Sequence, residues 1–77
     1  MNVRLYTTVG CHLCEDALAL LQQASQSGAD LEISEIEISD EDELLERYGI
    51  RIPVVARGDG VELGWPFTLE ELNTFLT

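Results

Sequence analysis

The sequence predicts an α/β fold in a single domain, in which three helices cover a four-stranded mixed sheet. Two observations lead to this prediction. The chain has 77 residues, 45% of them hydrophobic, which is enough for one core but not for two. Short β-prone apolar segments also alternate with segments whose apolar residues recur every three or four positions. The predicted order is β-α-β-α-β-β-α over residues 1–77, with no repeat or linker.

The first half of the chain predicts a strand, a helix and a second strand. Residues 3–6 form the first strand, and a helix over 12–26 follows, ended by Gly28. A second strand over 31–38 has Leu31 and Ile33 out of phase with Ile36 and Ile38, so either it begins late or a bulge lies near Ser34-Glu35. A helical crossover makes the two strands parallel. The apolar face of the first helix comprises Leu13, Ala17, Leu20, Leu21 and Ala24.

The second half predicts a short helix, a hairpin and a final helix. Residues 39–43 offer N-caps and an acidic first turn, Leu44, Leu45 and Tyr48 supply an apolar face, and Gly49 ends the helix. Strands over 50–56 and 61–63 are joined by a tight turn at 58–60. Thr68 and Glu71 have the spacing of a capping box, which opens a last helix ending near Leu76.

Both cysteines lie two residues apart, Cys11 and Cys14, at the junction between the first strand and the first helix. A helix N-terminus carries partial positive charge and unpaired N–H groups, and these favour a thiolate over a thiol. The second cysteine, one helical turn on, can close a disulfide. This arrangement predicts a dithiol redox site.

The charge of the chain restricts its partners. Fifteen acidic residues face four arginines and no lysine, for a net charge of −11. Such a chain is repelled by nucleic acid and by anionic membranes, so neither is expected as a partner. No apolar run has a membrane-spanning length, and no signal-peptide core is present, so we expect a cytoplasmic protein. The seven acids over residues 35–46 form either a solvated face or a patch that docks a basic partner.

The segment from Tyr6 to Cys14, followed by Ile52-Pro53-Val54, resembles the glutaredoxin branch of the thioredoxin superfamily. It is most similar to small bacterial glutaredoxin-like proteins with a Cys-His-Leu-Cys site. The resemblance implies a thioredoxin-like fold, Cys11 as nucleophile and Cys14 as resolving thiol. It further implies a cis peptide bond before Pro53, with the ring packed against the cysteine pair. The backbone of Ile52 would then hydrogen-bond the substrate.

Three further residues are assigned to the substrate-binding set. Tyr6 opens the motif segment. His12 either favours the Cys11 thiolate or is solvated, because adjacent helical positions point about 100° apart. Trp65 either fills the core or contacts the substrate.

Departures from the glutaredoxin pattern bear on the reductant. Thr8 and Val9 replace the lysine and proline that usually precede the first cysteine, and Gly64-Trp65-Pro66 replaces a Gly-Gly-acid segment that helps hold glutathione. Arg51 and Arg57 are the plausible substitute cations. No bound cofactor is expected, and glutathione remains a possible co-substrate beside a thioredoxin-type reductant.

The sequence therefore predicts a thiol–disulfide oxidoreductase that acts on a disulfide-containing protein or a small thiol compound. Two alternatives stay open: a non-catalytic adaptor with an acidic surface, and a protein that handles a metal or an iron–sulfur cluster. Zinc needs four ligands, and the chain offers two cysteines, His12 and otherwise only carboxylates. No metal ligands are assigned.

Overall fold

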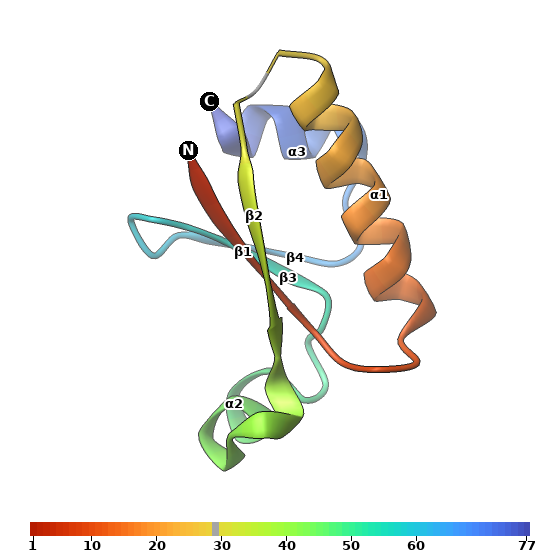
Figure 1. Ribbon diagram of the computed structural model, residues 1–77, viewed down its shortest axis with the longest axis vertical. Coiled ribbons are helices and arrows are strands. Elements are labelled where there is room, and N and C mark those ends of the chain that lie inside the picture. The colour runs from red at the N-terminus through yellow and green to blue at the C-terminus, as the bar shows by residue number, and fades with distance from the viewer. Residues whose placement is uncertain (29) are drawn as a thin grey trace.

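A mixed four-stranded sheet in the order β2-β1-β3-β4 organises the molecule, and three α-helices surround it (Figure 1). The computed structural model describes residues 1–28 and 30–77. This architecture confirms the predicted α/β fold class, with a four-stranded mixed sheet and three α-helices. The elements are β1 (Asn2–Thr7), α1 (His12–Gln26), β2 (Glu32–Glu37), a 3₁₀ helix η1 (Ile38–Asp40), α2 (Asp42–Tyr48), β3 (Val54–Arg57), β4 (Glu62–Gly64) and α3 (Leu69–Leu76).

The strand register resolves the ambiguity in the second strand. β1 and β2 are parallel, as predicted, and pair without interruption from Asn2–Glu32 to Thr7–Glu37, so β2 contains no bulge and begins after Leu31. Ile33 and Ile36 lie on opposite faces of the sheet because side chains alternate along a strand. Both are partly buried, each against a different core, since the sheet is covered on both sides.

Two apolar cores lie on the two faces of the sheet. The first packs β1 and β3 against α1 and α3, which lie side by side on one side in Figure 1. The second packs the other face against η1 and α2, at the opposite end of the molecule. The buried residues of the first core are Val3, Leu5, Ala17, Leu21, Ala24, Val55, Phe67, Leu72 and Leu76, and those of the second are Tyr6, Ile38, Tyr48, Val54 and Ala56.

Helix α1 has the predicted bounds, but its buried face differs by one residue from the predicted one. Cys14 is buried with Ala17, Leu21 and Ala24, whereas Leu13 is half-exposed. The reason is geometric: positions 14, 17, 21 and 24 are three or four residues apart and form one stripe, and Leu13 lies about 100° away from Cys14. The second cysteine therefore takes the place in the core that a leucine was predicted to fill.

Helix α2 is short and is closed by a glycine that packs against the helix backbone. A Cβ at Gly49 would lie 2.5 Å from the carbonyl oxygen of Leu45, so no larger residue fits without a shift. Leu45 was predicted to face the core but is exposed, because a helix of two turns presents only Leu44 and Tyr48 to the sheet.

The third strand is shorter than predicted. Residues 50–53 were expected to be part of it, but β3 begins at Val54. The preceding residues turn around the end of α2, where the N–H groups of Arg51 and Ile52 both donate to the Tyr48 carbonyl at 2.8 and 3.1 Å. β4 begins and ends one residue later than predicted.

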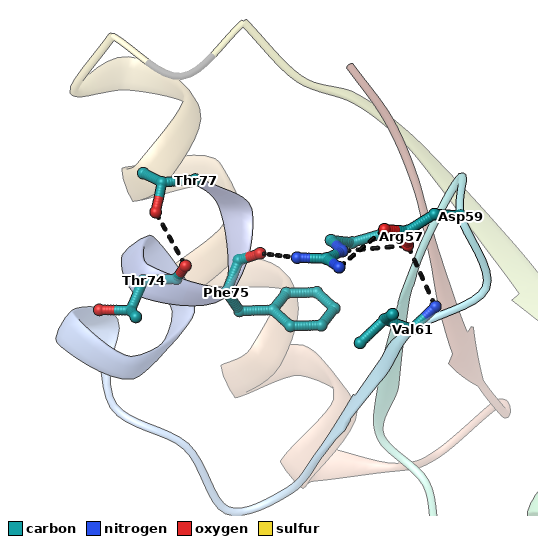
Figure 2. Close-up of polar contacts among 6 residues, drawn as sticks. All are labelled: Arg57, Asp59, Val61, Thr74, Phe75 and Thr77. Atoms are coloured by element: carbon teal, nitrogen blue, oxygen red, sulfur yellow. Dashed lines mark hydrogen bonds and ion pairs between the residues drawn. The ribbon is translucent and has the colours of Figure 1, made fainter.

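Polar contacts fix the last helix at both ends. The capping box is confirmed: Glu71 N–H donates to Thr68 Oγ1, and Thr68 N–H donates to the Glu71 carboxylate, both at 3.1 Å. At the other end, Arg57 of β3 donates to the Phe75 carbonyl at 2.8 Å and binds Asp59 with two nitrogens (Figure 2). Arg57 thus ties the β3–β4 hairpin to the C-terminal turn of α3.

Candidate active site

Cys11 and Cys14 lie at the start of α1 and are joined by a disulfide, with their Cα atoms 5.2 Å apart. Cys11 is the N-cap residue, with extended backbone angles, and Cys14 lies in the first turn. The sulfur of Cys11 accepts the backbone N–H of Cys14 at 3.1 Å. A side-chain atom of an N-cap residue normally accepts this kind of bond, so here the sulfur serves as the cap.

The two sulfur atoms differ in environment. Cys11 is partly exposed, whereas Cys14 is only 3% exposed and packs in the interior. Once the disulfide is reduced, the Cys11 sulfur faces the unpaired N–H groups and positive end of α1, which stabilise a negative charge. One sulfur is therefore open to attack and favoured as an anion, and the other is shielded within reach of it.

The loop that carries the motif is held by a glutamate from the neighbouring strand. Cys11 N–H closes a turn onto the Thr8 carbonyl, and Gly10 within that turn has a φ of +82°, which favours glycine. Glu37, at the end of β2, accepts the Val9 N–H at 2.9 Å. Hydrogen bonds from the Ser39 N–H and the Thr8 hydroxyl lower the pKa of Glu37, so it is a carboxylate at neutral pH.

Glu37 was not identified as a site residue from the sequence, where it was counted with the acidic run. A signal for it was present. The carboxyl ends of parallel strands meet at one edge of a sheet, so the last residue of the second strand comes beside the loop that leaves the first. The register places Glu37 opposite Thr7.

A hollow of about 380 Å³ opens beside the disulfide, between α1, the motif loop and β2. Both cysteines line it, together with Glu15, Glu35 and Glu37. The space next to the Cys11 sulfur is therefore bordered by carboxylates and favours positive over negative groups.

His12 points to solvent. Its side chain is 93% exposed, and Nδ1 lies 3.2 Å from the Glu15 carboxylate. The imidazole is thus paired with an acid one turn along the helix.

Pro53 lies at the same edge of the sheet as the motif. Val54 pairs with Tyr6, so the residue before it comes opposite the end of β1, where the loop to Cys11 begins. The Ile52–Pro53 peptide bond is cis, as is Trp65–Pro66. The Pro53 side chain is fully buried, and its carbonyl accepts the Trp65 N–H at 3.1 Å.

Residues 2–77 match the protein family described as Glutaredoxin-like domain (DUF836). The chain belongs to this glutaredoxin-like family. The structural-genomics target protein XcR50 from X. campestris is similar over nearly its whole length. Its X-ray structure is 36% identical, with a TM-score of 0.85, covering 96% of this chain and 93% of that one. Its solution structure is 37% identical, with a TM-score of 0.83 and coverage of 99% and 92%.

A more distant likeness concerns the fold alone. Thioredoxin 1 from the thermophilic eubacterium Thermosipho africanus is 15% identical, with a TM-score of 0.69, and the match covers 96% of this chain and 88% of that one. No curated protein is significantly similar to this chain. Together these findings confirm that the chain is glutaredoxin-like and has a thioredoxin-like fold.

Two residues assigned to the substrate-binding set in the sequence analysis are fully or partly buried. Tyr6 is 6% exposed and stacks on Tyr48, with ring centroids 4.0 Å apart, on the face of the sheet away from α1. Trp65 is partly buried against the first core, with its ring edge-on to Phe67 at 5.1 Å. Of the alternatives for Trp65, this placement favours core packing.

Both arginines proposed as glutathione-binding cations in this glutaredoxin-like chain have partners. Arg51 pairs with Glu62 at 3.0 Å. Arg57 is occupied by Asp59 and by the carboxyl end of α3 (Figure 2). Each positive charge is thus already matched by an acceptor of the chain itself.

The part of the chain that the structure describes, residues 1–28 and 30–77, contains no group of three or more His, Cys, Asp or Glu residues arranged to hold a metal ion. None of its helices is long and apolar enough to cross a membrane.

Proposed function

We propose that this glutaredoxin-like protein is a thiol–disulfide oxidoreductase, with Cys11 as the attacking thiol and Cys14 as the resolving thiol. One observation carries the proposal: the partly exposed sulfur of Cys11 is the N-cap of α1 and accepts the N–H of the buried Cys14. Dithiol exchange requires an accessible thiol that attacks the substrate and a second thiol that resolves the mixed disulfide, and the two cysteines differ in this way.

The chemistry proceeds through two exchanges. The Cys11 thiolate attacks one sulfur of a substrate disulfide, that S–S bond breaks, and the departing thiolate takes up a proton. Cys14, as a thiolate, then attacks the Cys11 sulfur of the mixed disulfide and releases the second substrate thiol. The substrate gains two electrons, and the protein is left with the Cys11–Cys14 disulfide. A dithiol or thiol reductant must restore the reduced form.

We further propose that the substrate and the reductant are proteins rather than glutathione. Glutathione carries two carboxylates and is a net anion at neutral pH. The hollow beside Cys11 is bordered by Glu15, Glu35 and Glu37, and the net charge of the chain is −11. Arg51 and Arg57 are committed to partners within the chain. These charges disfavour approach of a small anion and favour a protein surface with basic groups.

Two serine variants test the proposal. Cys11→Ser should abolish reduction of a protein disulfide, because no thiolate remains to attack. Cys14→Ser should instead accumulate a mixed disulfide with the substrate, because the resolving thiol is absent. Mass spectrometry of the trapped species identifies which cysteine is attached and to which protein.

The relative reactivity of the two thiols is an independent check. In the reduced protein at neutral pH, Cys11 should be alkylated by iodoacetamide faster than Cys14. Equal rates, or trapping through Cys14, would remove the assignment of roles. Full activity of Cys11→Ser would overturn the proposed function itself.

A further inference from the structure

Glu37, the last residue of β2, holds the loop that leads to Cys11 by three hydrogen bonds. Its Oε1 atom accepts the Val9 N–H at 2.9 Å, and its Oε2 atom accepts the Ser39 N–H at 3.1 Å. The Thr8 hydroxyl is the third donor to this carboxylate. We call these three bonds the Glu37 strap. A single carboxylate thus joins the motif loop to η1, which follows β2.

The strap acts on the backbone directly before the Cys11 sulfur. Val9 lies two residues before Cys11, inside the turn that the Cys11 N–H closes onto the Thr8 carbonyl at 3.3 Å. The sulfur itself accepts the Cys14 N–H at the start of α1. Because the turn is bonded at its ends and at Val9, the strap holds the sulfur against the N-terminus of α1.

The same carboxylate places a negative charge beside the two cysteines. Glu37 lines their hollow together with Glu35 of β2 and Glu15 of α1. Among the described residues that line this hollow, none is a cation. His12, which follows Cys11, is exposed and pairs with Glu15. A thiolate at Cys11 therefore faces carboxylates from two elements, while the N-terminus of α1 is the group that favours it.

Glu37 is charged throughout the neutral pH range. Hydrogen bonds, chiefly from the Ser39 N–H, lower its pKa from the ordinary 4.5. A nearby charge of the same sign disfavours the ionised form of a titrating group. The carboxylate therefore repels a thiolate at Cys11, but it has no such effect on the thiol or on the disulfide, which are both neutral.

We propose that Glu37 is a positioning residue for the Cys11 thiol, because its hydrogen bonds hold the sulfur at the helix N-terminus while its charge opposes formation of the thiolate. Only the reduced pair contains a thiolate, so this repulsion shifts the pair toward the disulfide. When the dithiol reduces a substrate disulfide it gives up two electrons and becomes the Cys11–Cys14 disulfide, so Glu37 makes it a stronger reductant. This rests on the proposed function and deepens it by naming a residue that sets the balance between dithiol and disulfide.

Glu37→Gln tests the charge, because glutamine keeps an oxygen that can accept the Val9 N–H. The rate of Cys11 alkylation by iodoacetamide is measured in the reduced protein over a series of pH values. The midpoint of this profile should fall by about half a pH unit, so that the thiolate fraction below the midpoint rises about threefold. In a dithiothreitol buffer of fixed redox ratio, the ratio of dithiol to disulfide should rise by up to the same factor.

Glu37→Ala removes the strap as well as the charge. The sulfur is then held less firmly at the N-terminus of α1, so the midpoint should lie above that of Glu37→Gln. Glu70→Gln is the matched control for net charge. Glu70 is an exposed acid on α3, and Figure 1 shows α3 beside the far end of α1 from the motif. This control should keep the wild-type midpoint.

Glu35→Gln tests the charge without disturbing the strap. It removes a second carboxylate from the same hollow and leaves the bonds from Val9 and Ser39 to Glu37 in place. The alkylation midpoint of this variant should also fall. The test therefore holds even if the variants at position 37 fail to fold.

The outcomes separate this proposal from the proposed function. Wild-type midpoints in both Glu37→Gln and Glu35→Gln would overturn the charge effect, and so would an equal shift in Glu70→Gln. Equal midpoints for Glu37→Gln and Glu37→Ala would overturn the positioning effect. None of these measurements needs a substrate. If the protein reduces no disulfide, the proposed function fails, while a lowered midpoint in Glu37→Gln still supports the action of Glu37 on the Cys11 thiol.

Discussion

Cys11 occupies a position where Ser, Thr, Asp and Asn are the usual residues, because their oxygen atoms accept well. A neutral sulfur is a weak acceptor, while a thiolate is a strong one. The bond from the Cys14 N–H to Cys11 therefore strengthens when the thiol loses its proton. Capping of α1 and the proposed nucleophilic role of Cys11 therefore depend on the same atom.

Substitutions at Cys11 should separate these two roles. Cys11→Ser replaces the sulfur with a better acceptor, so the variant should be more stable than Cys11→Ala by about 1 kcal/mol, the usual worth of an N-cap. Both should be inactive. Urea denaturation measures the difference, with the reduced wild type as reference. Equal stability of the two variants would show that residue 11 does not cap the helix.

Glu37 should make the stability of the folded protein depend on pH in the acidic range. Its pKa is lowered in the folded state from the ordinary 4.5, chiefly by the Ser39 N–H. The stabilisation that Glu37 gives the folded protein is therefore complete at a pH above its ordinary pKa. It is lost as the pH falls through the lowered pKa of the folded state. Glu37→Gln should be less stable at pH 7 and should lose less stability on acidification. Denaturation at a series of pH values measures this.

Glu35→Gln is the matched control, since Glu35 lines the same hollow from the same strand. It should follow the wild-type pH profile. A Glu37→Gln profile parallel to that of the wild type would contradict the role of Glu37 in holding the motif loop.

At the scale of elements, α1 and the capping box of α3 were predicted well because both follow from the spacing of residues close together in the sequence. The bounds of α1 follow from apolar spacing, and Thr68 and Glu71 from a four-residue motif. The start of β3 was missed because Ile50 and Ile52 have β-forming side chains. The N–H groups of Arg51 and Ile52 instead donate to the carbonyl of Tyr48, three and four residues earlier, and this turns the chain at the end of α2.

The same distinction applies to the candidate site. The two cysteines could be found from their spacing, and their relative exposure follows once α1 is placed. Glu37 and the hydrogen bond from Tyr48 to Glu62 could not be found in this way, because each depends on which elements are neighbours in space. The pairing of Tyr48 with Glu62, 14 residues apart, arises only when α2 crosses the face that carries β4.

Gly49 shows how a close backbone approach fixes the end of a helix. Gly49→Ala places a methyl group against the Leu45 carbonyl and should shift the end of α2. We expect a loss of about 1–3 kcal/mol in unfolding free energy, within the range of core strain. Thermal denaturation measures this loss. Gly58→Ala serves as control because a Cβ there meets nothing within 4 Å. Equal stability of both variants would show that a Cβ fits at position 49 without displacing the Leu45 carbonyl.

For the whole molecule, the imbalance of charge decides how small thiols reach the site. A net charge of −11 repels anionic glutathione at long range, and salt screens this repulsion over a Debye length of about 8–10 Å. We therefore expect weak glutathione-dependent activity that rises with ionic strength. A thioredoxin-type protein system should reduce the disulfide better. Steady-state rates over a salt series measure both.

The opposite salt dependence would identify a local cation. Strong activity with glutathione at low salt, falling as salt is added, would show that an arginine has left its partner to bind substrate. Arg51→Ala and Arg57→Ala would then differ, because Arg51 borders the segment before Pro53 while Arg57 is held at the far end of α3.

The disulfide closes a ring between residues only 3 apart in sequence. Such a small ring removes little freedom from the unfolded chain, about 2 kcal/mol in the chain-entropy relation. A thermodynamic cycle links folding to formation of the disulfide. Folding therefore favours the disulfide over the dithiol by the same modest amount. The protein can therefore gain and lose this bond repeatedly while its two cores stay intact. Under the proposed function, the pair would take up and release two electrons with only this small change in the stability of the fold.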